Sequence, residues 1–115
     1  MGTFSVPIEI GDPSGVTYKP VDALADTGAS YTALPASLLR DLAVPVHDRV
    51  AFILAGGRRI QRDIGRTWVR IGGKSEITLV VFGDEGTASL LGAYTLQGLL
   101  LSVDTANERW YRFQG

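Results

Sequence analysis

Cysteine is absent from the 115-residue chain, and histidine occurs once, at His47. Without cysteine there is neither a disulfide framework nor thiol chemistry. A single histidine cannot build a typical zinc site, and we expect neither a metal nor any other cofactor. Apolar runs long enough to span a membrane are also missing, because Gly98 and Ser102 interrupt the longest one. The N-terminal residues lack the basic-then-apolar order of a signal peptide, so we expect a cytoplasmic protein that binds no membrane.

Strong charge of either sign is missing as well. The chain has 11 basic and 12 acidic residues, a net charge of −1, so we expect no nucleic-acid partner. Apolar residues make up 45% and charged residues 20%, which is typical of a globular chain. A chain of this length can form one core but not two catalytic lobes. We therefore expect a single domain over residues 1–115.

The apolar pattern predicts a chain built mainly of β-strands. Short runs are separated by glycine and proline turns, and the pair Gly56-Gly57 is typical of a hairpin. Residues 36–44 carry leucines at helical spacing and predict a short helix before Pro45. Residues 76–82 are apolar on both faces and predict an interior strand. Further strands are expected at residues 4–11, 18–26, 49–71 (two strands), 99–104 and 108–113, and a second short helix after a strand end within residues 90–98.

Asp26 stands in an unusual place for a carboxylate. Three apolar residues precede it, and Thr27 and Gly28 follow before apolar character returns. Burying a lone charge is costly unless another group pairs with it. Asp26 therefore lies either in a surface turn, which Asp and Gly form readily, or next to a partner supplied by another part of the protein.

A second carboxylate would turn Asp26 into a catalyst. Two carboxylates within hydrogen-bond range share one proton, so one can accept a proton from water while the other donates to a carbonyl oxygen. Together they hydrolyse a peptide bond without a covalent intermediate. Because the motif occurs once, a C2 homodimer would pair Asp26 with its own copy. Gly28 would allow a tight loop with an N–H near the carboxylate, and the Thr27 hydroxyl would brace that loop across the axis.

Three sequence elements together resemble the retropepsin-like aspartic proteases, most closely their small prokaryotic members. They are Asp26-Thr27-Gly28-Ala29, the hairpin glycines Gly56-Gly57, and Leu90-Leu91-Gly92 before a short helix. The resemblance extends from about Val6 to Phe113. It implies an all-β fold with one or two short helices, namely a closed acid-protease barrel with one lobe per chain in a C2 homodimer. It also implies an aspartic endopeptidase that acts on peptides or proteins.

The resemblance assigns a role to each matching position. Asp26 would be the catalytic residue, Thr27 would interlock the two loops across the two-fold axis, and Gly28 would support the loop. The hairpin would act as a flap that closes over a bound peptide and excludes water. The residues implied to contact substrate are Gly28, Ala29, Ser30, Gly56 and Gly57.

Two positions depart from better-known relatives of this family. Retroviral members commonly carry an acidic residue where Ser30 stands, so this chain lacks the carboxylate that makes their contact at that position. Pepsin-like relatives carry a hydroxyl where Ala29 stands, and it bonds the catalytic carboxylate. Without that hydroxyl the ionised form is less stabilised, so we expect activity at mildly acidic to neutral pH.

An internal repeat fits the same resemblance. The segments "GASYTAL" (28–34) and "GAYTL" (92–96) both run Gly-Ala, then Tyr-Thr, then Leu, and each follows an apolar run. Such a weak repeat arises by chance or marks two structurally similar halves. In the family it would be the internal pseudo-symmetry, with Leu91 and Gly92 packed beneath the catalytic loop.

A group of arginines and a second function class remain open. Five arginines fall at positions 58, 59, 62, 66 and 70, and we prefer a solvated hairpin as their explanation. Selection of acidic substrate side chains is the sharper alternative, and nucleic-acid contact is disfavoured by the net charge. Because fold does not fix function, the alternative to an enzyme is a weakly active or inactive dimer that binds peptides or aids assembly. Asp26→Asn would abolish cleavage in the first case and leave peptide affinity unchanged in the second.

Overall fold

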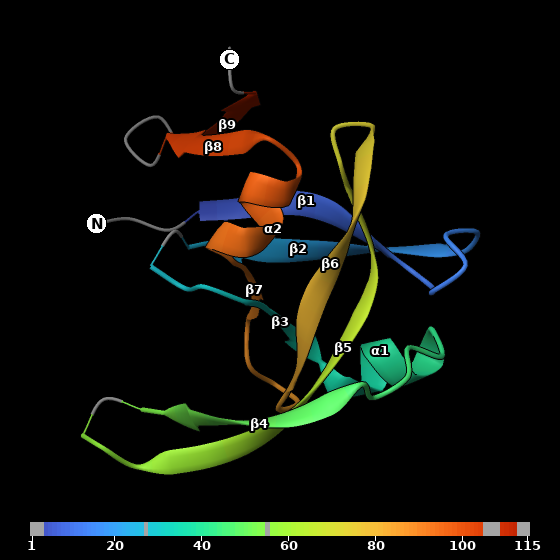
Figure 1. Cartoon of the computed structure of the whole chain (residues 1–115). Coiled ribbons are helices and arrows are strands. Elements are labelled where there is room, and N and C mark those ends of the chain that lie inside the picture. Colours follow the sequence, from blue (N-terminus) through green and yellow to red (C-terminus); the bar gives the residue numbers. More distant parts are fainter. Residues whose placement is uncertain (1–3, 27, 55, 105–108, 113–115) are drawn as a thin grey trace.

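The computed structural model describes residues 4–26, 28–54, 56–104 and 109–112 (Figure 1). Strands dominate these residues, and two short helices interrupt them. The strands are β1 (Phe4–Gly11), β2 (Tyr18–Ala25), β3 (Thr32–Pro35), β4 (Asp48–Ile53), β5 (Arg59–Ile71), β6 (Lys74–Gly83), β7 (Ser89–Leu91), β8 (Leu101–Asp104) and β9 (Arg109–Arg112). The helices are α1 (Ala36–Asp41) and α2 (Ala93–Gly98).

Six of these strands form a closed barrel. Their order is β1-β2-β7-β3-β6-β5, and a short antiparallel pairing of β5 with β1 closes the ring at Ile10 and Val69. Within the described residues β4 pairs with β5 alone, so it lies outside the ring. The predicted all-β barrel with short helices is confirmed.

An ion pair holds the seam where the barrel closes. Arg70 of β5 donates from Nε to Glu9 Oε1 of β1 at 2.8 Å and from Nη2 to Oε2 at 3.1 Å. Its guanidinium carbon lies 3.9 Å from the centre of the Tyr18 ring on β2. The hydrogen bonds from Arg70 hold the pKa of Glu9 below its ordinary value. Three strands therefore meet through side chains at the closure.

Apolar side chains fill the barrel in the pattern that strands require. The residues of β1 at positions 4, 6, 8 and 10 are at most 6% exposed, whereas Ser5 and Pro7 between them are exposed. This alternation follows from the two-residue period of a strand with one face in the core. β6 lies between β3 and β5, as predicted for an interior strand, and residues 80–82 are buried, whereas Ile77 near its start is 49% exposed.

The first helix is shorter than its sequence predicts. Helical spacing continues over residues 36–44, but α1 ends at Asp41. Ala43 adopts a φ of 57°, the left-handed conformation that often ends a helix. The amide of Val44 then donates to the Leu39 carbonyl at 2.9 Å. The leucine pattern predicted the buried face of the helix correctly, since Leu39 is fully buried.

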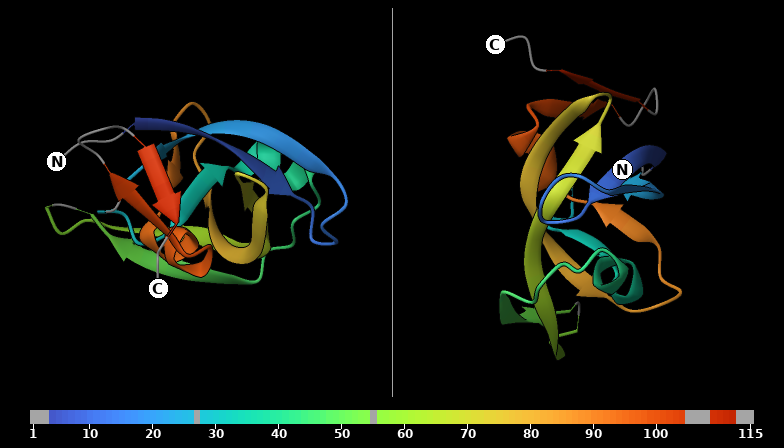
Figure 2. Two further views of the ribbon diagram at one scale, coloured as in Figure 1. Left: turned by 90° about the horizontal axis from the view of Figure 1, so that it is seen from above. Right: turned by 90° about the vertical axis from the view of Figure 1, so that its right-hand side faces the viewer.

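Two hairpins lie at opposite ends of the molecule (Figures 1 and 2). β4 and the first part of β5 form one of them. β8 and β9 form the other, a separate two-stranded sheet beside α2. Across the described residues, no helix has both the length and the apolar character needed to cross a membrane.

Candidate active site

Asp26 lies directly after β2, where the chain turns out of the barrel. Its amide donates to the Leu91 carbonyl of β7 at 3.1 Å, and its carbonyl accepts from the Ala29 amide at 3.1 Å. The Gly28 amide donates to Asp26 Oδ1 at 2.9 Å. Asp26 is half-buried, so its apolar flanks overstate how far it is removed from water. The loop therefore fixes both the backbone and one carboxylate oxygen of this residue.

The two similar segments of the sequence lie against each other. β2 and β7, which lead into them, pair in parallel. The amides of Ala93 and Tyr94 donate to the carbonyls of Ala29 and Ser30 at 2.8 and 3.0 Å. The rings of Tyr31 and Tyr94 meet edge to face, with 5.4 Å between their centroids. Matching residues of the repeat are thus in contact.

Three buried threonines tie the Asp26 loop to the elements beneath it. Thr95 Oγ1 of α2 lies 2.6 Å from Thr32 Oγ1 of β3 and 2.8 Å from Thr78 Oγ1 of β6. Thr32 Oγ1 also accepts from the Gly92 amide at 3.0 Å. Sequence reasoning missed this network, although Thr32 and Thr95 occupy matching positions of the repeat. Since all three threonines are buried, the hydrogen bonds form in a low-dielectric interior.

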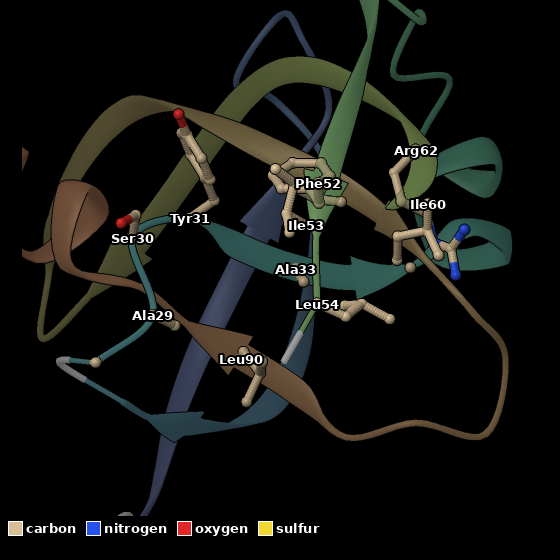
Figure 3. Close-up of a pocket in the computed structure, with 13 residues that line it drawn as sticks. Ala29, Ser30, Tyr31, Ala33, Phe52, Ile53, Leu54, Ile60, Arg62 and Leu90 are labelled. Atoms are coloured by element: carbon tan, nitrogen blue, oxygen red, sulfur yellow. The ribbon is translucent and has the colours of Figure 1, made fainter. Parts of the chain in front are cut away.

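A cleft of about 630 Å³ opens beside the Asp26 loop. One wall comes from the residues after Asp26 and from β3, and the β4–β5 hairpin forms another (Figure 3). The rings of Tyr31 and Phe52 meet edge to face across these walls, 5.8 Å between centroids. The lining residues are Gly28, Ala29, Ser30, Tyr31, Ala33, Phe52, Ile53, Leu54, Ile60, Arg62, Val81, Gly83 and Leu90.

Charge is scarce in this cleft. Arg62 is the one ionised side chain among the described residues that line it, and none of those residues is acidic. Nowhere in the described residues do three or more His, Asp or Glu side chains come together in a way that could hold a metal ion. Carboxylates that stand close in sequence to lining residues include Asp26, two residues before Gly28, Asp63, which follows Arg62, and Asp84, which follows Gly83.

Comparison with known proteins assigns the chain to a family. A family model described as "Aspartyl protease" matches residues 6–95, which include the Asp26 loop, the β4–β5 hairpin and the start of α2. The chain belongs to the aspartyl protease family. No curated protein sequence matches it closely enough to count as a relative.

A solved structure shows the same fold. The solution structure of the Simian Foamy Virus (mac) protease matches with a TM-score of 0.59. The match covers 82% of this chain and 92% of the viral one, at 20% sequence identity. The chain thus combines membership of the aspartyl protease family with a retropepsin-like fold, as its motifs predict.

The predicted site residues of this family member lie in three places. Gly28, Ala29 and Ser30 line the cleft. Gly56 and Gly57 lie in the exposed turn of the β4–β5 hairpin, outside the lining, with φ values of 94° and 85°. Thr27, predicted to brace the loop, lies outside the described residues.

The β4–β5 hairpin, expected from the sequence as a flap, forms a wall of the cleft, but sequence reasoning did not single out Ile60 or Arg62 within that wall. Phe52 pairs with Ile60 and Val50 pairs with Arg62 across the hairpin. Because side chains alternate along a strand, Ile60 and Arg62 share one face of β5. The Gly56-Gly57 turn fixes this register, so the hairpin pattern was the signal that could have found both residues. The positions of Val81 and Leu90 in the wall depend on strand pairings far apart in sequence, which no local pattern marks.

The five arginines of this family member serve different purposes. Arg58, Arg59 and Arg66 are exposed, as the solvated-hairpin interpretation expects. Arg70 belongs to the barrel seam instead. Arg62 departs furthest from that interpretation, because it lines the cleft.

Proposed function

We propose that the protein is a homodimeric aspartic endopeptidase in which Asp26 of two copies forms the catalytic pair. Family membership and the retropepsin-like fold support peptide hydrolysis. The observation that carries the proposal is the fixed position of Asp26, whose Oδ1 accepts from Gly28 at the edge of the cleft. The described lining of the cleft contains no carboxylate that could pair with Asp26, and a two-fold axis beside the loop would supply one.

The reaction needs one proton shared between the two carboxylates. Like charges this close do not both ionise, so one carboxyl is protonated and the other is not. The ionised carboxylate takes a proton from water as the water oxygen attacks the scissile carbonyl carbon. The protonated carboxyl donates its proton to the carbonyl oxygen, which gives a tetrahedral diol. The carboxyl formed in the first step then protonates the amide nitrogen, and the C–N bond breaks. At the same time a diol hydroxyl gives its proton to the other carboxylate, and the carboxylic acid product forms.

The other residues of the cleft hold the substrate for this reaction. Gly28, Ala29 and Ser30 line the wall next to Asp26, where the backbone of a bound peptide would lie. The carbonyls of Ala29 and Ser30 already accept hydrogen bonds from α2, so that wall is held rigidly. The β4–β5 hairpin would act as the flap, with Gly56 and Gly57 in its turn, and would exclude water when closed.

Digestion of a diverse peptide library, followed by mass spectrometry, tests this function. Wild type and Asp26→Asn are compared from acid to neutral pH, at concentrations where sedimentation shows a dimer. Cleavage by wild type alone supports an aspartic endopeptidase and gives its working pH. Equal cleavage by both proteins would reveal a contaminant and remove the support for activity. Cleavage by neither would favour the peptide-binding alternative.

Mixing the two proteins tests whether the catalytic pair is shared between chains. If subunits exchange at random, an equal mixture leaves half of the wild-type chains in mixed dimers that carry one Asp and one Asn. We expect the activity of a fixed amount of wild type to fall to about half in that mixture and to about a quarter with threefold excess of the variant. Activity that stays unchanged, while mass spectrometry shows that mixed dimers form, would contradict a shared pair.

A further inference from the structure

Arg62 is the charged residue of an otherwise uncharged cleft lining in the described part of the chain. Its side chain is 28% exposed, less than that of an ordinary surface arginine. In Figure 3, Arg62 and Ile60 lie on the side of the cleft opposite Ala29 and Ser30. The guanidinium is therefore set away from the Asp26 loop. It would face a part of a bound peptide that is distant from the bond being cleaved.

Two neighbouring groups orient the Arg62 guanidinium, but it keeps further N–H donors that can bind a ligand. Nη1 donates to the Gln61 carbonyl at 3.0 Å, and Nη2 donates to Asp84 Oδ2 at 2.8 Å. A guanidinium has five N–H donors, and these two bonds are those it makes to described residues. The Asp84 side chain is 66% exposed. An ion pair that faces water in this way is weak, so Asp84 does not prevent a second carboxylate from binding.

A bound peptide would change the electrostatics around Arg62. Covering the cleft removes water from a lining made mostly of apolar groups, and charge interactions become stronger as the dielectric falls. A carboxylate on the peptide would then form a charge-assisted hydrogen bond with the guanidinium. A lysine or arginine at the same position of the peptide would be repelled.

We propose that Arg62 makes the cleft select peptides that carry an acidic side chain at one position remote from the cleaved bond. This inference rests on the proposed function and specifies the substrate class of the same cleft. It does not extend to the neighbouring arginines. Arg66 lies four residues further along β5, is exposed and is outside the lining. Arg70 is bound to Glu9 at the barrel seam.

Paired peptides provide the test. A peptide that wild type cleaves is remade with Glu, Gln or Lys at each position in turn, and kcat/KM is measured near pH 6. At one position we expect Glu to be favoured over Gln by about tenfold, the effect of one charge-assisted hydrogen bond, and Lys to be disfavoured. High salt should reduce the preference because the cleft remains partly open to solvent. Equal cleavage of the Glu and Gln peptides at every position would overturn the inference.

Three variants assign the preference to a residue. Arg62→Gln should bring the Glu-to-Gln ratio at that position to about one, since the charge is lost while hydrogen-bonding capacity remains. Asp84→Asn should raise the ratio, because the competing carboxylate is removed. Arg66→Gln is the matched control on the same strand and should leave the ratio as in wild type. A ratio that persists in Arg62→Gln, or that falls equally in Arg66→Gln, would contradict a role for Arg62.

Binding separates this inference from the proposed function. If Asp26→Asn abolishes cleavage but wild type does not discriminate Glu from Gln, the enzyme stands and the role of Arg62 falls. If wild type cleaves nothing, fluorescence anisotropy with labelled Glu and Gln peptides on Asp26→Asn still measures selection. If the Glu peptide binds more tightly than the Gln peptide, and Arg62→Gln abolishes that difference, selection by Arg62 would be supported in a protein that does not cleave. Absence of any peptide binding would overturn both proposals.

Discussion

Gly92 lies against Tyr31 so closely that a side chain has no room there. A Cβ at Gly92 would lie 2.4 Å from the carbonyl carbon of Tyr31 and 2.5 Å from its oxygen. These are backbone atoms, so they cannot rotate away as a flexible side chain would. The contact joins the start of α2 to the end of the Asp26 loop. Gly92 therefore sets how closely the two halves of the repeat approach each other.

Gly92→Ala should destabilise the fold and displace the Asp26 loop. Overpacking against fixed atoms costs typically about 1–3 kcal/mol, and we expect the upper part of that range. Gly98→Ala, at the other end of α2, is the control, because among the described residues its Cβ would meet only Glu76 Cγ, at 3.6 Å. That change should be neutral or stabilise by up to about 1 kcal/mol, since alanine favours a helix. Urea unfolding measures both, and equal stability of the two variants would contradict the role given to Gly92.

Thr95→Val should cost stability through lost hydrogen bonds and not through lost volume. Valine has nearly the shape of threonine, but the hydroxyls of Thr32 and Thr78 would lose their shared partner. Leaving buried hydroxyls unsatisfied costs about 1–3 kcal/mol. Thr95→Ser retains the hydroxyl and should be the more stable of the two variants in thermal and urea unfolding. The reverse order would show that the methyl group of Thr95 matters more than the network.

Glu85 should make stability depend on pH below neutrality. The Ser37 hydroxyl and then the Ser37 amide donate to its carboxylate, and they lower its pKa from the ordinary value of 4.5. The unfolded chain then binds more protons than the folded one, so this stabilisation is complete above 4.5 and is lost as pH falls through the folded pKa. Glu85→Gln should therefore be less stable than wild type at pH 7, with a difference that shrinks at low pH. If the stability difference between wild type and Glu85→Gln did not change with pH, this linkage would be contradicted. The same holds if that difference were as large in a Ser37→Ala background.

Local sequence patterns were enough to predict most of the strands and the Asp26 loop, but not β3. The alternation in β1 and the glycine pair of the β4–β5 hairpin depend on neighbouring residues, and both appear as expected. The repeat marks two segments that the structure brings together, because Tyr31 and Tyr94 meet at matching positions.

Other features depend on pairings that no local pattern specifies. The barrel closes through Arg70 and Glu9, which are 61 residues apart. Position alone separates Arg62 in the cleft from Arg66 outside it, although both are arginines of one strand. The early end of α1 was missed for a different reason, since the apolar spacing continues to Val44, past the left-handed residue Ala43.

Gly57→Ala should reduce catalysis more than a matched change elsewhere. Gly57 and Gly73 adopt similar left-handed φ values, 85° and 83°, and at neither would an added Cβ have an atom of the described residues within 4 Å. Alanine at either site should therefore cost a similar, small amount of stability, about 1–2 kcal/mol. Under the proposed function only Gly57 lies in the flap turn, so Gly57→Ala should lower kcat/KM while Gly73→Ala, in the β5–β6 turn, should not. An equal loss of kcat/KM in both variants would trace the effect to general stability, because the strain is the same and only the place in the fold differs.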